Sequence, residues 1–460
     1  MGGAVITAAG FLALQLWLIH AGSRDYDEGV YWQSIRAMLR GEPLFRSVFA
    51  SQPPAFYYVL LPFYAISHSL GALRLTVLCF AIAGIAAIYL GGRLVAGPAA
   101  ALVAVILLAG SPLYIQEAAI VQADMPAVAM MVVAVAIMIA ANRQQGRRAS
   151  ILAMLAGLAF ATALGLKLLA AVAVVPLLLY LLMPRRQPLR VIAGFAAGTV
   201  LGVLIILIPA FASPSTAYDD LVAGHLLAGQ ATHAGITANL RQLLQPRELP
   251  LIVLAVAASL AGVLRRDPRI LAPLAWSVAA IAAILIYQPL FPHHLLLLTP
   301  ALALTAAVGF DVVTSWRPAR VGVAAAVVTV VAVIGLGFGF RDAQRSLIPN
   351  GHGAGLAAAV RSATKPGDYV ISDNPFAVAL AGRDVPGPLV DTSHERTLAG
   401  LLTVADLDAA RVNYSVKVVL TDGGRLQSVP GFSDWLATHY HLVGSVGRDA
   451  YLYTALHETD

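Results

Sequence analysis

Long apolar segments alternate with short polar ones along the first three quarters of the chain, a pattern typical of helices that cross a membrane. The apolar segments of spanning length fall at 4–20, 72–92, 98–115, 124–141, 190–211, 249–264, 270–287, 292–312 and 320–339. A further apolar stretch, 151–183, would be about 50 Å long as one helix, against a hydrocarbon core of about 30 Å. Arginines precede and follow it, so we expect it to cross twice, turning near Gly165-Leu166-Lys167. This pattern predicts about eleven spans.

The basic residues between these segments predict an orientation. They form clusters in alternate loops: Arg93; Arg143, Arg147 and Arg148; Arg185, Arg186 and Arg190; Arg265, Arg266 and Arg269; Arg317 and Arg320. Because basic loops stay in the cytoplasm, the N-terminus is predicted to be cytoplasmic and the region after the last span extracytoplasmic. Residues 1–19 carry no Lys or Arg, so 4–20 is read as an uncleaved first span and not as a signal peptide. The expected location is the bacterial inner (plasma) membrane.

After the last span the pattern changes to that of a small α/β domain. Short strand-like runs and helical stretches alternate there. The strands are expected at Asp368–Ser372, Val416–Thr421, His441–Val446 and Ala450–Thr454, and the helices at Gly353–Ala363, Leu398–Arg411 and Phe432–His439. The predicted organisation is therefore a transmembrane domain, 1–340, followed by an extracytoplasmic α/β domain, 341–460.

Composition agrees with this division. The chain is 59% hydrophobic and 12% charged, and its mean hydropathy is +0.78, values that a soluble chain of this length does not reach. The net charge of +6 does not indicate nucleic-acid binding, because the arginines sit in loops that set topology. The single cysteine, Cys79, excludes a disulfide within the chain and is read as a lipid-facing or core residue.

Ionisable residues collect at the predicted outer face, where the membrane penalises them least but where function often retains them. Asp25, Asp27 and Glu28 follow the first span, Asp124 heads another, Lys167 lies alone at the predicted turn, and His293-His294 begin a third. Each also has a plainer reading: a solvated loop for the first group, a helix cap for Asp124, snorkelling for Lys167, and a boundary anchor for the histidines.

The segment that follows Asp27-Glu28 contains aromatic residues and an amphipathic stretch, Ser34–Leu39. Ser51-Gln52-Pro53-Pro54 and Tyr57-Tyr58 come after this stretch. Such a segment predicts interfacial helices that lie along the bilayer surface. The region 212–248 has a similar polar and aromatic mixture, including His225 and Arg241. It is read either as a further helix covering a site or as an ordinary amphipathic loop.

In order and spacing, these motifs resemble the GT-C superfamily of membrane glycosyltransferases, in particular the protein O-mannosyltransferase and lipid A aminoarabinose transferase (PMT-like) branch. The resemblance covers roughly residues 1–340. The matching residues are Asp27-Glu28, Tyr31, Gly41, Pro53-Pro54 with Tyr57 and Tyr58, Asp124-Met125-Pro126, Gly165-Leu166-Lys167 and the Pro292–Pro300 stretch.

The resemblance implies a donor sugar linked to polyprenyl phosphate and transfer to a lipid, glycan or protein acceptor on the outer side. By analogy, the catalytic residues are Asp27 as general base, Glu28 as its neighbour in the acidic motif, and Asp124. The substrate is expected to be lined by Tyr31, Gln52, Tyr57, Tyr58, Gln122 and His225. Inversion at the anomeric carbon is expected, because a base on one face and cations on the other suit a single displacement.

One departure concerns the donor phosphate. The aminoarabinose branch has an acidic-basic pair where this chain has Ser51-Gln52. The phosphate-binding cation is therefore expected elsewhere, from Lys167, His293, His294 or Arg241.

No cofactor is required by these motifs, but a divalent metal, Mg or Mn, is left open. Asp27, Glu28 and Asp124 offer the hard oxygen ligands that such ions prefer. A polyprenyl-lipid or small-molecule transporter or flippase is the alternative function, and a non-catalytic membrane anchor is a third. Repeated halves and midplane sites typical of transporters are not seen in the sequence, which favours the enzyme.

The C-terminal domain shows no nucleophile triad, zinc spacing or glycine-rich phosphate loop. Its histidines are read as surface or structural residues. The loop Asp384–Arg396 is the one segment there that we expect to help bind an acceptor.

Overall fold

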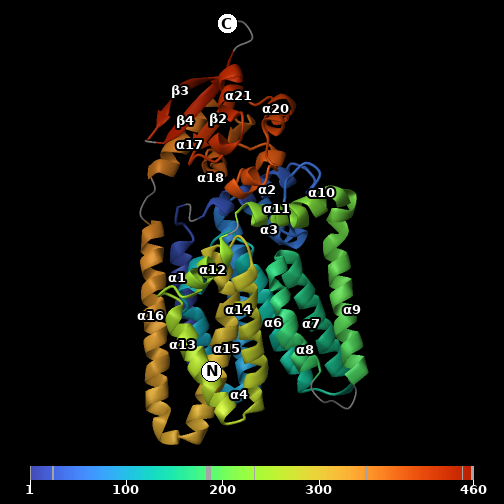
Figure 1. The fold of residues 1–460 in the computed structure, drawn as a ribbon, viewed down its shortest axis with the longest axis vertical. Coiled ribbons are helices and arrows are strands. Elements are labelled where there is room, and N and C mark those ends of the chain that lie inside the picture. Colours follow the sequence, from blue (N-terminus) through green and yellow to red (C-terminus); the bar gives the residue numbers. More distant parts are fainter. Residues whose placement is uncertain are drawn as a thin grey trace.

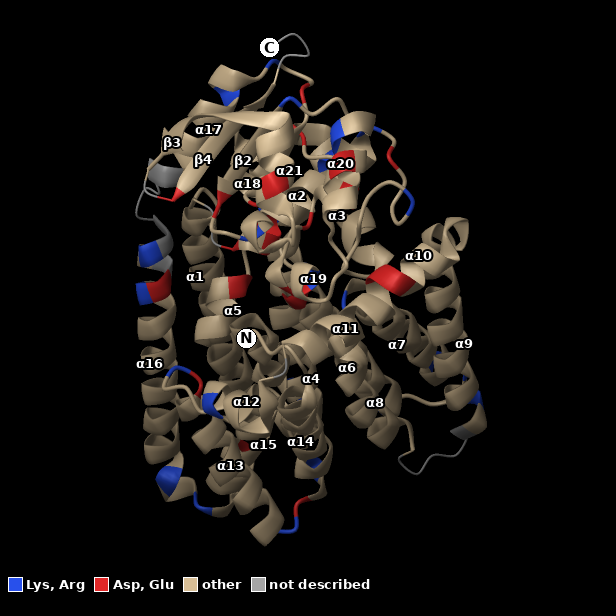
Figure 2. Cartoon of the chain, turned by 45° about the horizontal axis from the view of Figure 1, so that its top comes forward, with Lys and Arg blue, Asp and Glu red and all other residues tan. Residues whose placement is uncertain are grey.

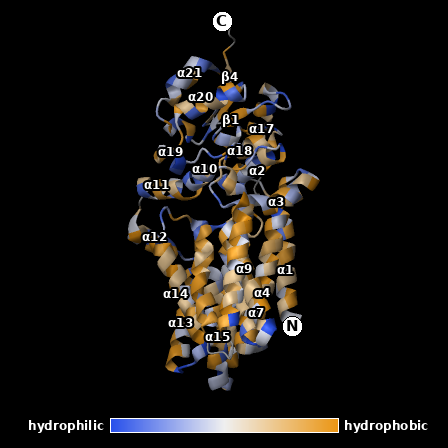
Figure 3. Ribbon diagram, turned by 90° about the vertical axis from the view of Figure 1, so that its right-hand side faces the viewer, coloured by the Kyte–Doolittle hydropathy of each residue, from blue (hydrophilic) through white to orange (hydrophobic). Residues whose placement is uncertain are grey.

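The computed structural model describes residues 2–22, 25–182, 188–232, 234–347, 351–447 and 449–456. Long apolar helices form a bundle, short helices lie across one end of it, and a small domain with a β-sheet sits on those short helices (Figure 1). Hydrophobic residues dominate the bundle, whereas hydrophilic and hydrophobic residues are mixed in the small domain (Figure 3). The chain is therefore a polytopic helical membrane protein with a C-terminal domain outside the bundle.

Seven stretches in the described part of the chain are long and apolar enough to cross a membrane. They contain α4 (Leu70–Ala109), α6 (Asp124–Asn142), α7 (Gly146–Leu166), α9 (Pro188–Leu207), α14 (Leu271–Ile286), α15 (Thr299–Trp316) and α16 (Val321–Leu347). Shorter apolar helices are α1 (Gly2–Leu18), α3 (Pro54–Ser67), η1 with α8 (Leu168–Leu181) and α13 (Leu249–Leu264). The total of eleven crossings stays a prediction.

Helix α4 contains two of the predicted spans and bends back between them. Gly97 has φ 90° and ψ −176°, and Pro98 follows it. A left-handed φ favours glycine, and proline cannot continue the preceding helical turn. A Cβ added to Gly92 would lie 3.0 Å from the Cα of Ala101, so the two arms pack closely beside the bend.

The apolar stretch expected to turn near Gly165-Leu166-Lys167 is broken there. Helix α7 ends at Leu166, and Lys167 is extended, with φ −158° and ψ 129°. The chain resumes as η1 (Leu168–Ala173) and α8 (Val174–Leu181). The break leaves Lys167 between the two helical segments, where it lines the same cavity as residues of the C-terminal domain.

Helices α7 and α9 pack through glycines. A Cβ on Gly194 would lie 2.5 Å from the carbonyl oxygen of Ser150, one on Gly202 would lie 2.6 Å from Ala161 Cβ, and one on Gly198 would collide with the Met154 carbonyl. Small residues at this spacing let helix backbones approach closely in a membrane.

The short helices at the end of the bundle that carries the C-terminal domain include both elements expected for the predicted first outer loop. Helix α2 spans Tyr26–Leu39 and α3 spans Pro54–Ser67. The region 212–248 contains η2 (Ile208–Ala212), α10 (Pro214–Tyr218), η3 (Asp219–Ala223), α11 (Gly224–Ala231) and α12 (Gly235–Leu243). Figure 2 shows charged residues at the two ends of the bundle and few along its length. Which end faces the cytoplasm stays a prediction.

The C-terminal domain has a four-stranded mixed sheet of order β1-β2-β4-β3 and its own hydrophobic core. The strands are β1 (Val370–Ser372), β2 (Val418–Asp422), β3 (Tyr440–Val446) and β4 (Ala450–Ala455). The helices are α17 (Gly351–Ala363), α18 (Pro375–Leu380), α19 (His394–Leu398), α20 (Val404–Asn413) and α21 (Phe432–His439). Strands β1 and β2 are parallel, and the remaining pairs are antiparallel. Helix α16 runs to Leu347, past the predicted boundary at 340.

The C-terminal domain is docked on α2 by a polar anchor. The amide of Gln33 donates to the carbonyl oxygens of Pro375 and Arg383, at 3.3 and 3.1 Å, and accepts from the Val385 N–H at 3.3 Å. The ring of Phe376 packs edge-on against Trp32 at 5.6 Å between centroids. Because Gln33 is buried, its satisfied amide fixes the position of the domain over the first outer loop.

Candidate active site

A cavity of about 430 Å³ lies between the bundle and the C-terminal domain. Its walls come from the start of α2, the segment around 49–53, the start of η1, helix α11, the segment 287–294 before α15, and the segment 391–401 of the C-terminal domain. Elements far apart in the sequence therefore meet at one place. This volume is sufficient for a sugar and its immediate linkage.

Asp27 faces this cavity from the first turn of α2. Asp25 caps the helix by accepting the Asp27 N–H at 2.9 Å, which fixes the direction of that turn. Among the described residues, no group hydrogen-bonds to the Asp27 carboxylate or pairs with it. Burial raises the pKa of Asp27 well above its usual value, and the nearby carboxylates of Asp25 and Asp391 add to the rise.

Glu28, predicted as a catalytic residue, does not line the cavity. It is fully buried and forms two charge-assisted hydrogen bonds with Arg74, at 2.8 and 2.6 Å. It also accepts the Val121 N–H at 3.2 Å. Arg74 in turn donates to carbonyl oxygens at the end of α1. A carboxylate with its oxygens engaged in this way positions α2 and does not reach a substrate.

Asp124 and Lys167 form a buried ion pair beside the cavity. Lys167 Nζ lies 2.6 Å from Asp124 Oδ2, and His293 Nε2 lies 4.0 Å from the same oxygen. Lys167 and His293 line the cavity, whereas Asp124 lies behind them. Lys167 therefore does not snorkel, and its charge is balanced inside the protein.

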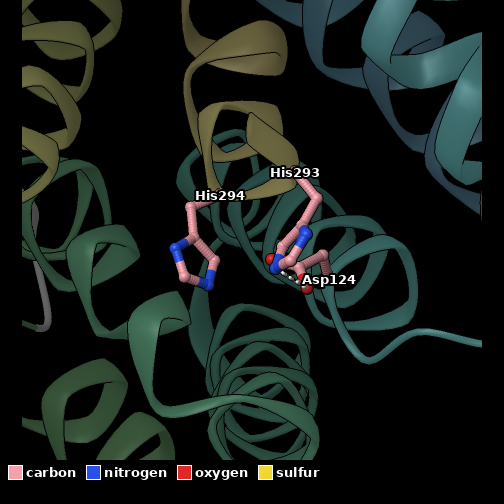
Figure 4. Close-up of side chains that lie close together, drawn as sticks. All are labelled: Asp124, His293 and His294. Carbon is pink, nitrogen blue, oxygen red and sulfur yellow. Dashed lines mark ion pairs between the residues drawn. The ribbon is translucent and has the colours of Figure 1, made fainter. Parts of the chain in front are cut away.

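Asp124, His293 and His294 are close enough to share a metal ion, since each offers a ligand atom within 4.8 Å of the others (Figure 4). The surroundings do not fit one. The Lys167 ammonium already lies 2.6 Å from the Asp124 oxygen that an ion would need. Nδ1 of His294 accepts the Phe291 N–H at 3.2 Å, which leaves the proton of the neutral ring on the other nitrogen. The predicted oxygen set also fails, because Glu28 is committed to Arg74.

The remaining predicted residues divide into two groups. Those lining the cavity are Tyr31, Gln52, His225, Lys167, His293 and His294. Those that do not are Tyr57, Tyr58, Gln122 and Arg241. Tyr58 is 44% exposed and Arg241 is exposed on α12, so both point away; Tyr57 and Gln122 are buried in packed surroundings. The cavity lining therefore gives no support to Tyr57, Tyr58 and Gln122 as lining residues or to Arg241 as a phosphate ligand, and these roles stay predictions.

The C-terminal domain supplies cavity residues that sequence analysis did not single out. They are Asp391, Ser393, His394, Glu395, Arg396, Leu401 and Arg425. Tyr26 ties this wall to α2, because its hydroxyl accepts the Thr392 N–H at 2.8 Å. Asp220 joins the bundle side to the segment before α3 by accepting the Ala50 N–H at 3.1 Å. Burial raises the pKa of Asp220 to about 7.

Comparisons with known proteins show what the chain is similar to. Residues 51–212 match the family described as dolichyl-phosphate-mannose-protein mannosyltransferase. No curated protein matches the sequence. Among solved structures, ArnT from Cupriavidus metallidurans bound to undecaprenyl phosphate is 17% identical, with a TM-score of 0.72 over 99% of this chain and 98% of that one.

Two other enzymes have the same fold. The Archaeoglobus fulgidus oligosaccharyltransferase, crystallised with Zn and sulfate, is 16% identical, with a TM-score of 0.62 over 98% of this chain and 72% of that one. The arabinofuranosyltransferase AftD from Mycobacteria is 14% identical, with a TM-score of 0.60 over 99% of this chain and 40% of that one.

The chain has the fold that ArnT, the oligosaccharyltransferase and AftD share, and residues 51–212 resemble the dolichyl-phosphate-mannose-protein mannosyltransferase family. The predicted resemblance to PMT-like proteins is therefore confirmed.

Proposed function

We propose that the protein transfers a sugar from a polyprenyl-phosphate donor to an acceptor hydroxyl inside the cavity, with Asp27 as the general base and inversion at the anomeric carbon. One observation carries this proposal. Among the predicted catalytic carboxylates, Asp27 alone lines the cavity, and its carboxylate makes no hydrogen bond or ion pair with the described residues.

The chemistry needs one proton acceptor and no obligatory proton donor. The acceptor oxygen forms a bond to the anomeric carbon while the bond from that carbon to the phosphate oxygen breaks. Asp27 takes the hydroxyl proton, and polyprenyl phosphate leaves with the bonding electron pair. A buried carboxylate with a raised pKa is a stronger base than an exposed one and is better matched to this task near neutral pH.

Asp124 acts on the reaction through its neighbours. Its ion pair with Lys167 and its proximity to His293 hold two cavity residues in place from behind. We therefore assign Asp124 a positioning role. The donor lipid fits the bundle side of the cavity, where Leu168, Leu169, Leu221 and Ala228 give an apolar wall. The ArnT structure with undecaprenyl phosphate and the oligosaccharyltransferase AglB with dolichol-phosphate support a lipid of this kind.

The location proposed for transfer is the outer face of the bacterial inner membrane. The site lies at the end of the bundle that carries the C-terminal domain (Figure 1). A lipid donor can keep its tail in the bilayer there while its phosphate and sugar enter the cavity. The acceptor is a lipid, glycan or protein; the complex of AglB with an inhibitory peptide is an example of the last type.

The test is Asp27→Asn in the purified full chain. Loss of the base is expected to lower turnover of a polyprenyl-phosphate sugar by about 100-fold or more, while undecaprenyl phosphate still binds. The matched control is Asp25→Asn, which removes a neighbouring carboxylate but keeps an effective helix cap. Its turnover is expected to fall by less than about 10-fold. Full activity in Asp27→Asn would exclude Asp27 as the base.

A further inference from the structure

Among the described residues, three cationic side chains other than histidine line the cavity: Lys167, Arg396 and Arg425. The charge of Lys167 is balanced by Asp124 at 2.6 Å. The two arginines come from the C-terminal domain, and neither has a described carboxylate within the 4.0 Å of an ion pair. In the part of the chain that the structure describes, the arginines are therefore positive charges of the cavity without an ion-pair partner.

Each arginine is held against an aromatic ring of the first outer loop. The Arg396 guanidinium carbon lies 3.9 Å from the centre of the Phe49 ring, and that of Arg425 lies 4.0 Å from the centre of the Tyr26 ring. Stacking on an aromatic face orients a planar guanidinium while leaving its edge N–H groups free to bind an anion.

Other contacts also hold both arginines in place. Asp373, just after strand β1, accepts the backbone N–H groups of Arg425 and Leu426, at 3.1 and 3.3 Å. The side chain of Arg396 donates from Nη1 to the carbonyl oxygens of Pro388 and Asp391, at 2.8 and 2.7 Å. By contrast, Arg396 Nε is buried and has no hydrogen-bond partner among the described residues. A buried donor without an acceptor is uncommon in proteins and is expected where a ligand completes the bonding.

Two of the carboxylates that line the cavity, those of Asp391 and Asp220, are engaged by backbone groups. Asp391 Oδ1 accepts the Ser393 N–H at 2.8 Å, and Asp220 Oδ2 accepts the Ala50 N–H at 3.1 Å. Neither forms an ion pair with Arg396 or Arg425. The space beside the two guanidinium groups is thus suited to an external anion.

We propose that Arg396 and Arg425 form an anion subsite that binds the phosphate of the polyprenyl-phosphate donor. This inference rests on the proposed function, which requires a phosphate whose negative charge grows as it leaves. Arginine matches phosphate oxygens with paired N–H groups and stabilises that growing charge. Ser51-Gln52 lacks the basic residue that the aminoarabinose branch has at this place. In this chain, the C-terminal domain would supply the positive charge instead.

The experiment measures binding of undecaprenyl phosphate and of undecaprenol to the purified full chain in detergent. Arg396→Gln and Arg425→Gln are each expected to weaken undecaprenyl phosphate binding by about 10-fold or more, the usual effect of losing a charged hydrogen bond. Binding of undecaprenol, which has no phosphate, is expected to stay unchanged. The matched control is Arg411→Gln, because Arg411 pairs with Asp408 on the same domain and does not line the cavity.

The outcomes separate the subsite from the function on which it depends. If the wild-type chain does not bind undecaprenyl phosphate, the proposed function fails. If it binds and both variants bind equally well, the subsite proposal fails, and a raised KM for the acceptor alone would assign the arginines to an acidic acceptor. Arg425 makes no side-chain hydrogen bond with the described residues, so Arg425→Gln keeps the test valid if Arg396→Gln does not fold.

Discussion

Asp27, Glu28 and Asp124 look equivalent as acidic residues near the outer face, yet their surroundings divide them. Glu28 is bound to Arg74 and Asp124 to Lys167, whereas Asp27 faces the cavity without such a partner among the described residues. The partners lie at positions 74 and 167, and spacing along the sequence does not show contacts of that range. Sequence reasoning could therefore choose the residue types but could not tell the carboxylate that faces the cavity from the two that are held in ion pairs.

The pH dependence of turnover should report the raised pKa of Asp27. The base acts when ionised, so kcat/KM is expected to fall as pH falls through that pKa. Because burial raises this pKa, the acidic limb should lie well above the 3.8 of an ordinary aspartic acid. A pH–rate profile of the wild-type chain measures it, and a rate that stays constant down to about pH 4 would contradict the assignment.

The Asp124–Lys167 pair should contribute to stability as well as to the site. Lys167→Met leaves a buried carboxylate without its cation, which is expected to cost about 3 kcal/mol. Thermal unfolding in detergent measures the loss. In the double variant Lys167→Met/Asp124→Asn, much of the stability should return because no buried charge remains. Equal stability of the wild type and the single variant would show that the pair does not stabilise the fold.

At the scale of elements, agreement with the sequence was closest where a strong local signal existed. Helix α21 has the predicted bounds Phe432–His439, and each predicted strand overlaps an observed one. The break at Lys167 was also expected, because the length of the apolar stretch and its flanking arginines required a turn. The predicted helix Leu398–Arg411 is wrong, since it is divided into α19 and α20 by Gly400, whose φ of 71° does not continue a helix.

The contact between α7 and α9 depends on glycine. Gly198→Ala places a methyl group against the Met154 carbonyl and is expected to destabilise the bundle by about 1–3 kcal/mol. Gly337→Ala is the control, because it changes another apolar helix at a position with nothing within 4 Å of the added Cβ. Unfolding temperatures of the two variants compare them. If Gly198→Ala is as stable as Gly337→Ala, the helices do not need their close approach.

At the scale of the whole molecule, the site is made from both ends of the chain. The general organisation, apolar bundle followed by α/β domain, follows from hydropathy. Hydropathy does not predict that Asp391, Arg396 and Arg425 line the cavity. The docking of the C-terminal domain rests on Gln33 and on backbone groups, and these contacts carry no sequence signal. The sequence pointed to this part of the domain only through the loop Asp384–Arg396, which is expected to help bind an acceptor. That role stays a prediction.

Turnover is expected to be insensitive to metal chelators. Lys167 already supplies positive charge beside Asp124, so no ion is needed to balance that carboxylate. EDTA treatment followed by a donor-turnover assay, with and without added Mg²⁺, Mn²⁺ or Zn²⁺, measures this. Activity lost to EDTA and restored by one of these ions would contradict the expectation.

The joint construction of the cavity has a consequence for biosynthesis. Asp27 leaves the ribosome well before Arg396 and Arg425, which lie far along the chain. At about 10 residues per second, roughly 40 s separate the synthesis of Asp27 from that of Arg425. During that time the cavity lacks the wall that the C-terminal domain supplies. Under the proposed function, a nascent chain is therefore expected to use no donor until residues 391–425 have been made and folded.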